Sequence, residues 1–270
     1  DRKDHVLKLL ANLYGQKQAG RVWNGYLVEK LLELGFKQSQ IDDCVFYRGD
    51  VIFIIYVDDG IFLGPSDDAI SGAINELMNL DLDIEDQGHP ADYICIAIKH
   101  LCDGSLELSQ CALIDTIIND AKLDDAKVKR VPAKVKENLH AHLDKPPYAL
   151  EMSYRSAIGK LNYVGQTSRP EIMYAVHQLA KYSSNPREPH GEALLYLIRY
   201  LKLTRDIGLR FSPNSNRGFD CYTDADFAGN WNKALAPYDP STAKSRSGWI
   251  VFYAGCPVIW ASKLQSMDAL

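Results

Sequence analysis

Two adjacent carboxylates, Asp58 and Asp59, stand between the apolar segments Val51–Val57 and Ile61–Leu63. Carboxylate oxygens suit Mg²⁺, which proteins usually hold through one or two carboxylates together with substrate phosphates. A third acidic side chain from another strand would complete a two-metal site for nucleotidyl transfer. A simpler interpretation stays open, because Asp59-Gly60 is a favoured tight-turn dipeptide and by itself predicts only the closure of a hairpin.

Local patterns predict the elements that must position this pair. Helical spacing of apolar residues over Arg21–Leu34, followed by Gly35, predicts a helix. Residues rich in Val, Ile, Phe and Tyr then predict an antiparallel three-stranded meander, and Ser66 with its two following aspartates predicts the start of a helix that runs to about Leu80. The strands of the meander are Cys44–Tyr47, Val51–Val57 and Ile61–Leu63.

The rest of the chain predicts a hairpin, a helix, a linker, further helices and short strands. Asp103-Gly104 marks the hairpin turn, and a stretch at 124–148 with three prolines and many basic residues is interpreted as a linker. Short strands are expected from Gly208 onward. The hairpin strands are Tyr93–Lys99 and Ser105–Leu108, and the helices are Gln110–Ala121, Tyr154–Gly165, Ile172–Tyr182 and His190–Leu203.

Composition is that of an ordinary globular protein. The 270 residues carry a net charge of −5, with 46% hydrophobic and 24% charged residues, which excludes a disordered chain. The longest apolar run is far too short to span a membrane. Six cysteines without a C-x-x-C pair predict reduced, intracellular thiols. The sequence begins without methionine or a secretory leader and ends after strand-like sequence, so we expect a chain cut at both ends.

Charge is distributed unevenly along the sequence. Residues 57–92 hold ten acidic residues and no Lys or Arg, whereas residues 199–217 hold five basic residues and one acid. Each run is interpreted as a solvated face unless further observations give it a role.

The histidines give weaker signals. His140-Ala141-His142 lacks a cysteine or acid at zinc spacing, which favours a solvated linker over a metal site. His177 falls within a predicted helix, and we expect it to be packed or capping rather than catalytic.

The order of several blocks resembles the reverse transcriptases of Ty1/copia-class retrotransposons. The blocks cover essentially the whole chain and follow the order found in that family. They are Leu13–Trp23, Asp42–Phe46, Tyr56–Asp59, Leu108–Gln110, Tyr154–Tyr163, Ser168–Ile172, Tyr174–Val176, His190, Arg199–Lys202, Tyr222–Gly229 and Ser245–Gly248.

The resemblance implies an α+β fold in four parts. These are a partial reverse-transcriptase palm of antiparallel sheet plus helices at 1–109, a thumb helix and linker at 110–150, a helical connection at 151–215, and the N-terminal part of a truncated ribonuclease H-like sheet at 216–270. It also implies RNA-directed DNA polymerisation by a two-metal mechanism at the Tyr-Val-Asp-Asp hairpin.

Residue roles follow from the same resemblance. Asp58 and Asp59 would be the catalytic, Mg²⁺-binding carboxylates of the palm, with Tyr56 against the primer end. Asp224 would be the first catalytic, metal-binding carboxylate of the ribonuclease H domain.

The first block supplies candidates for binding the incoming nucleotide. Gln18, with Lys17 or Arg21, would contact it, because Lys and Arg suit its phosphates and an amide can hydrogen-bond. The alternative for Lys17 and Arg21 is surface charge at a helix start, and we expect Trp23 in the core rather than as a base-stacking platform.

The implied partners are an RNA template, a DNA primer and deoxynucleoside triphosphates. Basic faces of the thumb and connection would hold the duplex mainly through its phosphates. No membrane partner is expected. The implied location is intracellular, in the cytoplasmic particle of the element or in the nucleus.

Some family features are missing or changed. Cys95 replaces a usual glycine in the hairpin that resembles the primer grip. The first palm aspartate lies further upstream in the family, and the ribonuclease H glutamate lies further downstream, so we expect Mg²⁺ to be held poorly. One alternative is a catalytically incomplete or decayed fragment that at most binds nucleic acid. Another is a palm-type nucleotide cyclase, which the blocks after Tyr154 disfavour.

Overall fold

The computed structural model describes residues 8–9, 12–13, 15–80, 82, 84–134 and 139–268. Tyr14 of the first block and residues 135–138 of the predicted linker lie outside this part of the chain. The described residues form a mixed α+β structure with antiparallel sheets, and the chain divides into two compact units, at 1–90 and 91–270. No helix in the described part of the chain is long and apolar enough to cross a membrane.

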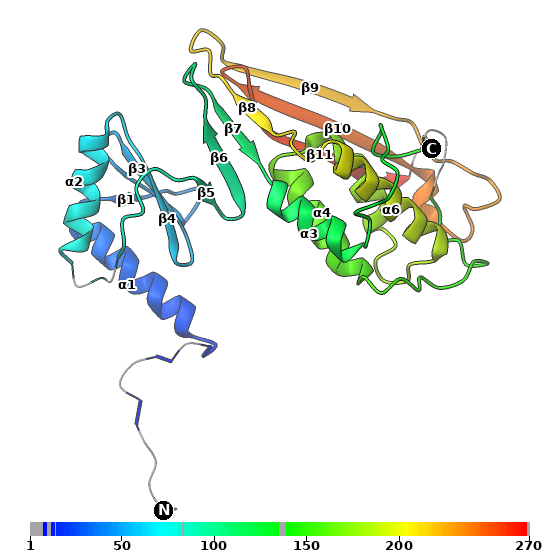
Figure 1. The fold of residues 1–270 in the computed structure, drawn as a ribbon, viewed down its shortest axis with the longest axis horizontal. Helices are drawn as coiled ribbons and strands as arrows, with labels where there is room; N and C mark the ends of the chain where they lie inside the picture. Colours follow the sequence, from blue (N-terminus) through cyan, green and yellow to red (C-terminus); the bar gives the residue numbers. More distant parts are fainter. Residues whose placement is uncertain are drawn as a thin grey trace, which may run out of the picture. The chain divides into compact units, whose positions relative to one another are not determined.

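The first unit packs two helices on one antiparallel sheet of order β1-β2-β3-β4 (Figure 1). Strand β3 alternates buried and less buried residues, so Val51, Phe53 and Ile55 enter the core with Leu27 and Leu31 of α1. The predicted helices and meander are confirmed. The elements are α1 (Ala19–Glu33), β1 (Lys37–Gln38), β2 (Val45–Arg48), β3 (Val51–Tyr56), β4 (Asp59–Leu63) and α2 (Asp67–Met78).

The second unit joins a helical core to two sheets, of orders β5-β6-β7-β8 and β11-β10-β9. Its elements are β5 (Asp92–Tyr93), β6 (Ile96–His100), β7 (Leu106–Ser109), α3 (Cys111–Asp120), α4 (Tyr154–Thr167), η1 (Pro170–Ile172), α5 (Met173–Ala180), α6 (Glu188–Leu203), β8 (Leu209–Phe211), β9 (Phe219–Ala225), η2 (Pro240–Ala243), β10 (Lys244–Tyr253) and β11 (Cys256–Asp268).

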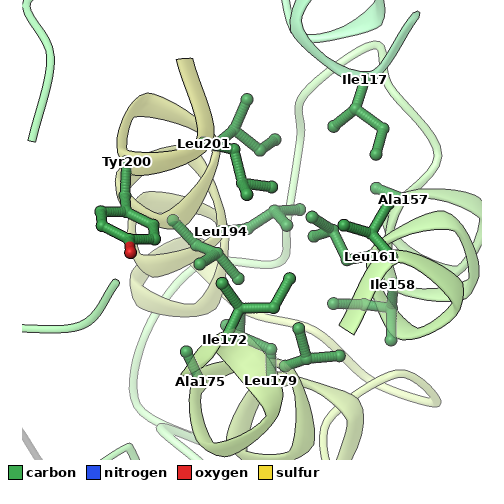
Figure 2. Packing of buried hydrophobic residues seen from close by; sticks show 14 of the residues in the cluster. Ile117, Ala157, Ile158, Leu161, Ile172, Ala175, Leu179, Leu194, Tyr200 and Leu201 are labelled. Carbon is green, nitrogen blue, oxygen red and sulfur yellow. The ribbon is translucent and has the colours of Figure 1, made fainter. Parts of the chain in front are cut away.

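Helices α3 to α6 meet around one apolar cluster. Figure 2 shows Ile117, Leu161, Leu179 and Leu194 converging from the four helices. The long hairpin β10–β11 is attached to this helical layer, since Trp260 Nε1 donates to the Gly165 carbonyl at 2.8 Å. Burial of these side chains is the main stabilising force of the unit.

One sequence-based expectation about strands is corrected. Strands β10 and β11 are long rather than short, at 10 and 13 residues. Strand β8 joins the hairpin β6–β7, with Leu108 opposite Leu209, and so places that hairpin in the second unit. These pairings join residues about 100 positions apart, which a local pattern cannot reveal. The predicted palm, thumb and connection boundaries describe functional parts and stay predictions.

The linker histidines are half-buried, which corrects the expectation of a solvated linker for His140 and His142. Their rings stack at 3.5 Å, and His142 lies edge-on to the buried His190 at 5.4 Å. His190 is neutral, because its Nδ1 accepts from the Arg187 N–H while its Nε2 donates to the His140 carbonyl. The described residues contain no group of three potential metal ligands.

The turn between β5 and β6 carries backbone strain. Ile94 and Cys95 form its two-residue loop, with φ of +50° and +60°. Both residues have side chains that disfavour the left-handed region, and Ile94 is also β-branched. The Tyr163 hydroxyl donates to the Ile94 carbonyl at 2.5 Å and holds the turn. Cys95 therefore costs free energy through its backbone angle, which a glycine would adopt without strain.

We expect Cys95→Gly to raise the free energy of unfolding by about 1 kcal/mol, because glycine adopts a positive φ without strain. Urea denaturation measures this change. Cys102→Gly is the control, since Cys102 is an exposed turn cysteine outside the left-handed region. Equal or lower stability of Cys95→Gly would contradict the strain argument.

A second prediction concerns three histidines of this unit, of which His190 is buried and His142 and His177 are half-buried. Burial lowers the pKa of His142 to about 4, and burial also lowers the pKa values of His177 and His190. The unfolded chain therefore binds more protons below about pH 6.5. The stability that the neutral imidazoles contribute is complete above this pH and is lost as the pH falls toward about 4.

We expect the Tm of the chain to fall as the pH is lowered from about 7 to about 4.5, before most carboxylates titrate. His142→Asn should flatten this dependence, since asparagine tolerates the φ of +47° at this position. His100→Asn, at an exposed residue, should leave the slope unchanged. Identical slopes for the two variants would exclude His142 as a source of the pH dependence.

Candidate functional site

The acidic pair lies at the tip of the hairpin β3–β4 in the first unit. Tyr56 pairs with Asp59 across the two strands, which leaves Val57 and Asp58 as a two-residue turn. Both aspartates and Tyr56 are exposed, and the Tyr56 side chain has 56% of its surface accessible. The buried part of β3 thus holds the exposed carboxylates on a rigid support.

The Asp-Gly dipeptide does not form the turn, which corrects the simpler interpretation of this sequence. Asp59 and Gly60 belong to β4. A Cβ atom on Gly60 would stand 2.6 Å from the Phe53 ring, so a larger residue would displace that ring from the core. The glycine is needed for close packing across the hairpin rather than for a positive φ.

The turn is strained and pinned by a helix. Val57 is β-branched and has a φ of +57°, a conformation that costs about 1–3 kcal/mol. Trp23 of α1 donates from its indole Nε1 to the Val57 carbonyl at 3.2 Å. This bond fixes the residue that immediately precedes Asp58 and therefore restricts where the carboxylates point.

Trp23 is the positioning residue that the sequence interpretation did not identify. It was expected in the core, yet 37% of its surface is exposed and its indole binds the hairpin turn. The available signal in the sequence was the tryptophan itself, in a block that precedes the acidic hairpin. Only the fold shows that the helix carrying it reaches a turn 34 residues away.

The predicted nucleotide-binding residues lie at the start of α1. Gln18 is the residue before the helix, and its amide donates to Asn12 Oδ1 and Gln16 Oε1, both at 3.3 Å. Lys17 and Arg21 are exposed. Arg21 is two residues before Trp23 in α1, so helical spacing places it on another face of the helix.

The described residues bring two carboxylates to this hairpin. No group of three His, Cys, Asp or Glu side chains able to hold a metal is found in the part of the chain that is described. Two hard oxygen donors on a fixed turn match what Mg²⁺ takes from a protein when substrate phosphates supply further ligands. The donor set therefore fits a nucleotide-bound Mg²⁺ ion.

Asp224 lies in the second unit, near the end of β9 and opposite Gly248 of β10. Its side chain is exposed. Asp226, two residues further on, is engaged, because its Oδ1 accepts from the Arg246 N–H at 2.7 Å. Within the described residues, Asp224 belongs to no group of three potential metal ligands.

Most of the basic stretch at 199–217 is already paired inside the protein. Arg205 pairs with Asp115, Arg210 with Asp103 and Arg217 with Asp220, and the Lys202 ammonium donates to backbone carbonyls at the end of the α3 region. By contrast, Lys127 and Arg130 are exposed, and the described residues give them no ion-pair partner. Ion pairs at the protein surface are weak. A phosphate that binds one of these basic side chains must nevertheless compete with its acidic partner.

The sequence matches the family model described as reverse transcriptase (RNA-dependent DNA polymerase) over residues 1–135, half of the chain. It is 30% identical over 98% of its length to the retrovirus-related Pol polyprotein from transposon RE2 of Arabidopsis thaliana. It is 28% identical over its full length to the corresponding polyprotein from transposon TNT 1-94 of Nicotiana tabacum.

The chain spans 18% and 20% of the lengths of these two polyproteins. It covers 82% of the putative transposon Ty5-1 protein of Saccharomyces cerevisiae, with 27% identity. No solved structure matches the chain. The family match, the alignment over nearly the whole chain and the ordered sequence blocks agree, so the chain belongs to the reverse transcriptase family of Ty1/copia-type retrotransposon Pol polyproteins.

Proposed function

We propose that this chain contributes the acidic hairpin of an RNA-directed DNA polymerase, with Asp58 and Asp59 as its catalytic metal ligands. The observation that carries the proposal is the strained Val57-Asp58 turn, held by Trp23 on a rigid sheet in a chain of this family. Backbone strain of this kind persists where the surrounding structure enforces it, and it concentrates at functional sites.

The chain's own residues then have separate roles. Asp58 and Asp59 would hold Mg²⁺, which supplies charge neutralisation on the phosphates and a more acidic primer 3′-hydroxyl. Tyr56, exposed beside the pair, would lie against the primer end. Positioning of the two reacting groups accounts for much of the rate in such reactions, so a fixed turn is an advantage.

The remaining parts of the proposal concern substrates and subdomains. Lys17, Gln18 and Arg21 would bind the incoming deoxynucleoside triphosphate, with the guanidinium on its phosphates. The parts at 1–109, 110–150, 151–215 and 216–270 would serve as palm, thumb, connection and ribonuclease H-like domain. Asp224 would be the first carboxylate of that last domain, and the intracellular particle of the element would be its location.

A second candidate function is binding of nucleic acid without catalysis. It is favoured by the two-carboxylate hairpin, because the described residues bring no third ligand to it. The experiments below separate the two functions.

We expect Asp58→Asn to lower Mg²⁺-dependent extension of a DNA primer on an RNA template at least about 100-fold, because several kcal/mol of charge stabilisation is lost. The assay uses the 270-residue chain and, in parallel, the full product of its own open reading frame. Binding of the primer and template is measured in the same samples.

Asp50→Asn is the matched control, since Asp50 is an exposed acid in the neighbouring turn of the same sheet. It should retain wild-type extension. Extension by Asp58→Asn at the wild-type rate would refute the catalytic assignment. Binding without extension by either wild-type protein would favour the second candidate function.

A further prediction concerns the two exposed cations of the linker. Lys127→Gln and Arg130→Gln should each weaken binding of an RNA·DNA duplex and reduce the slope of log K against log salt by about 1. Lys122→Gln should change it less, because Lys122 already pairs with Glu151. Fluorescence anisotropy at several salt concentrations measures the slopes. An unchanged slope in both variants would remove this segment from the interface.

A further inference from the structure

A group of basic side chains lies between α5 and β10, in the second unit. Arg246 is only 6% exposed. Its Nη1 donates to His177 Nδ1 at 3.1 Å and to the carbonyl and hydroxyl oxygens of Ser262 at 3.4 and 3.3 Å. Because an arginine only donates, His177 accepts through Nδ1 and carries its proton on Nε2. It is therefore neutral and does not balance the arginine charge.

The other edge of the guanidinium has no hydrogen-bond partner among the described residues. Arg246 Nε and Nη2 are both buried and make no hydrogen bond. These two N–H groups form one edge of the planar group, the fork that binds two oxygens of a carboxylate or phosphate. A buried charge that lacks such a partner costs several kcal/mol. The unsatisfied edge is thus shaped for an oxyanion.

A second cation nearby is also unsatisfied. The Lys181 Nζ atom is buried without a hydrogen-bond partner. Lys181 follows His177 by four residues, one helical turn along α5, and His177 contacts Arg246. Burial lowers the pKa of Lys181, the Asp239 carboxylate raises it, and the charge of Arg246 lowers it. In the described part of the chain, no carboxylate oxygen lies within 4.0 Å of the Lys181 ammonium or the Arg246 guanidinium.

The nearest acids are already engaged by other donors. Asp226 accepts from the backbone N–H of Arg246. Asp239 accepts from the Tyr182 hydroxyl at 3.0 Å and from the Ser241 N–H at 3.2 Å. Neither carboxylate satisfies the free edge of the guanidinium or the Lys181 ammonium, so the cluster keeps an excess of positive charge.

We propose that the Nε/Nη2 edge of Arg246 and the ammonium of Lys181 form a binding site for a phosphate group. A phosphate offers two oxygens to the arginine fork and a third to the lysine. The Tyr174 ring lies 5.1 Å from the guanidinium, the residue is 44% exposed and its hydroxyl accepts from Gln178 Nε2 at 3.1 Å, so a phosphate would enter by displacing this ring. Inorganic phosphate and an internucleotide phosphate share this chemistry.

The site does not depend on the proposed polymerase function. It is built from residues of α5, β10 and the position after α5, none of which belongs to the acidic hairpin. Its test measures binding rather than primer extension. A failure of the phosphate-site proposal therefore leaves the proposed polymerase function unaffected, and the reverse also holds.

The test is a titration of the chain with inorganic phosphate, followed by calorimetry and by Tm, against sodium chloride at equal ionic strength. We expect saturable binding that chloride does not reproduce. Lys181→Met and Arg246→Lys should each weaken the Kd at least about tenfold, the second because lysine lacks the fork. Lys160→Met is the control, since Lys160 pairs with Asp120 elsewhere on the unit, and it should bind as wild type.

Far-UV circular dichroism verifies that each variant is folded, and Lys181→Met keeps the test valid where an Arg246 variant unfolds. No binding beyond the chloride control, or a wild-type Kd in Lys181→Met, would overturn the proposal. A competition arm adds a short RNA·DNA duplex without terminal phosphates. Displacement of phosphate assigns the site to a nucleic-acid backbone, and retention assigns it to free phosphate; both results support a phosphate site.

Discussion

The geometry of the acidic hairpin depends on one hydrogen bond, from the Trp23 indole to the Val57 carbonyl. A valine at φ +57° relaxes toward the β region unless neighbouring groups prevent it. The bond and the two-residue turn length together enforce the strained angle, and the core contacts of β3 anchor the hairpin beneath it. The direction of the Asp58 and Asp59 carboxylates follows from these constraints.

The second unit uses the same device at another turn. Ile94, also β-branched, has a φ of +50°, and its carbonyl accepts from the Tyr163 hydroxyl. In both turns an aromatic side chain on a helix binds the carbonyl of the first turn residue. A helix is a rigid support, so such a bond transmits the position of the helix to the tip of the hairpin. Each turn is therefore set by tertiary structure rather than by turn chemistry.

In the second unit, the charge state of each buried basic side chain depends on the hydrogen-bond partners that it finds. His190 is neutral because both ring nitrogens are used, one as acceptor and one as donor. His177 is neutral because it accepts from Arg246. Arg169 is almost completely buried as well, but Glu171 and the Thr204 oxygens satisfy it. Arg246 and Lys181 differ from it, since unsatisfied donors remain on both, and Arg246 leaves two such donors where Arg187 and Arg199 each leave one.

The sequence by itself determined the class of fold, most helices and strands, and the family. These follow from local periodicity, from the Ser66 cap and from ordered blocks such as Tyr56–Asp59. Each of these signals lies in residues that are close together in the sequence. The tertiary structure decided what no local pattern contains. It placed Trp23 at the hairpin turn, paired β8 with β7, stacked the rings of His140 and His142, and paired Arg205 and Arg210 with acidic partners. Each of these contacts joins residues from separate elements. The energy of each contact depends on its burial and on the relative direction of the interacting groups, and only the folded chain defines both.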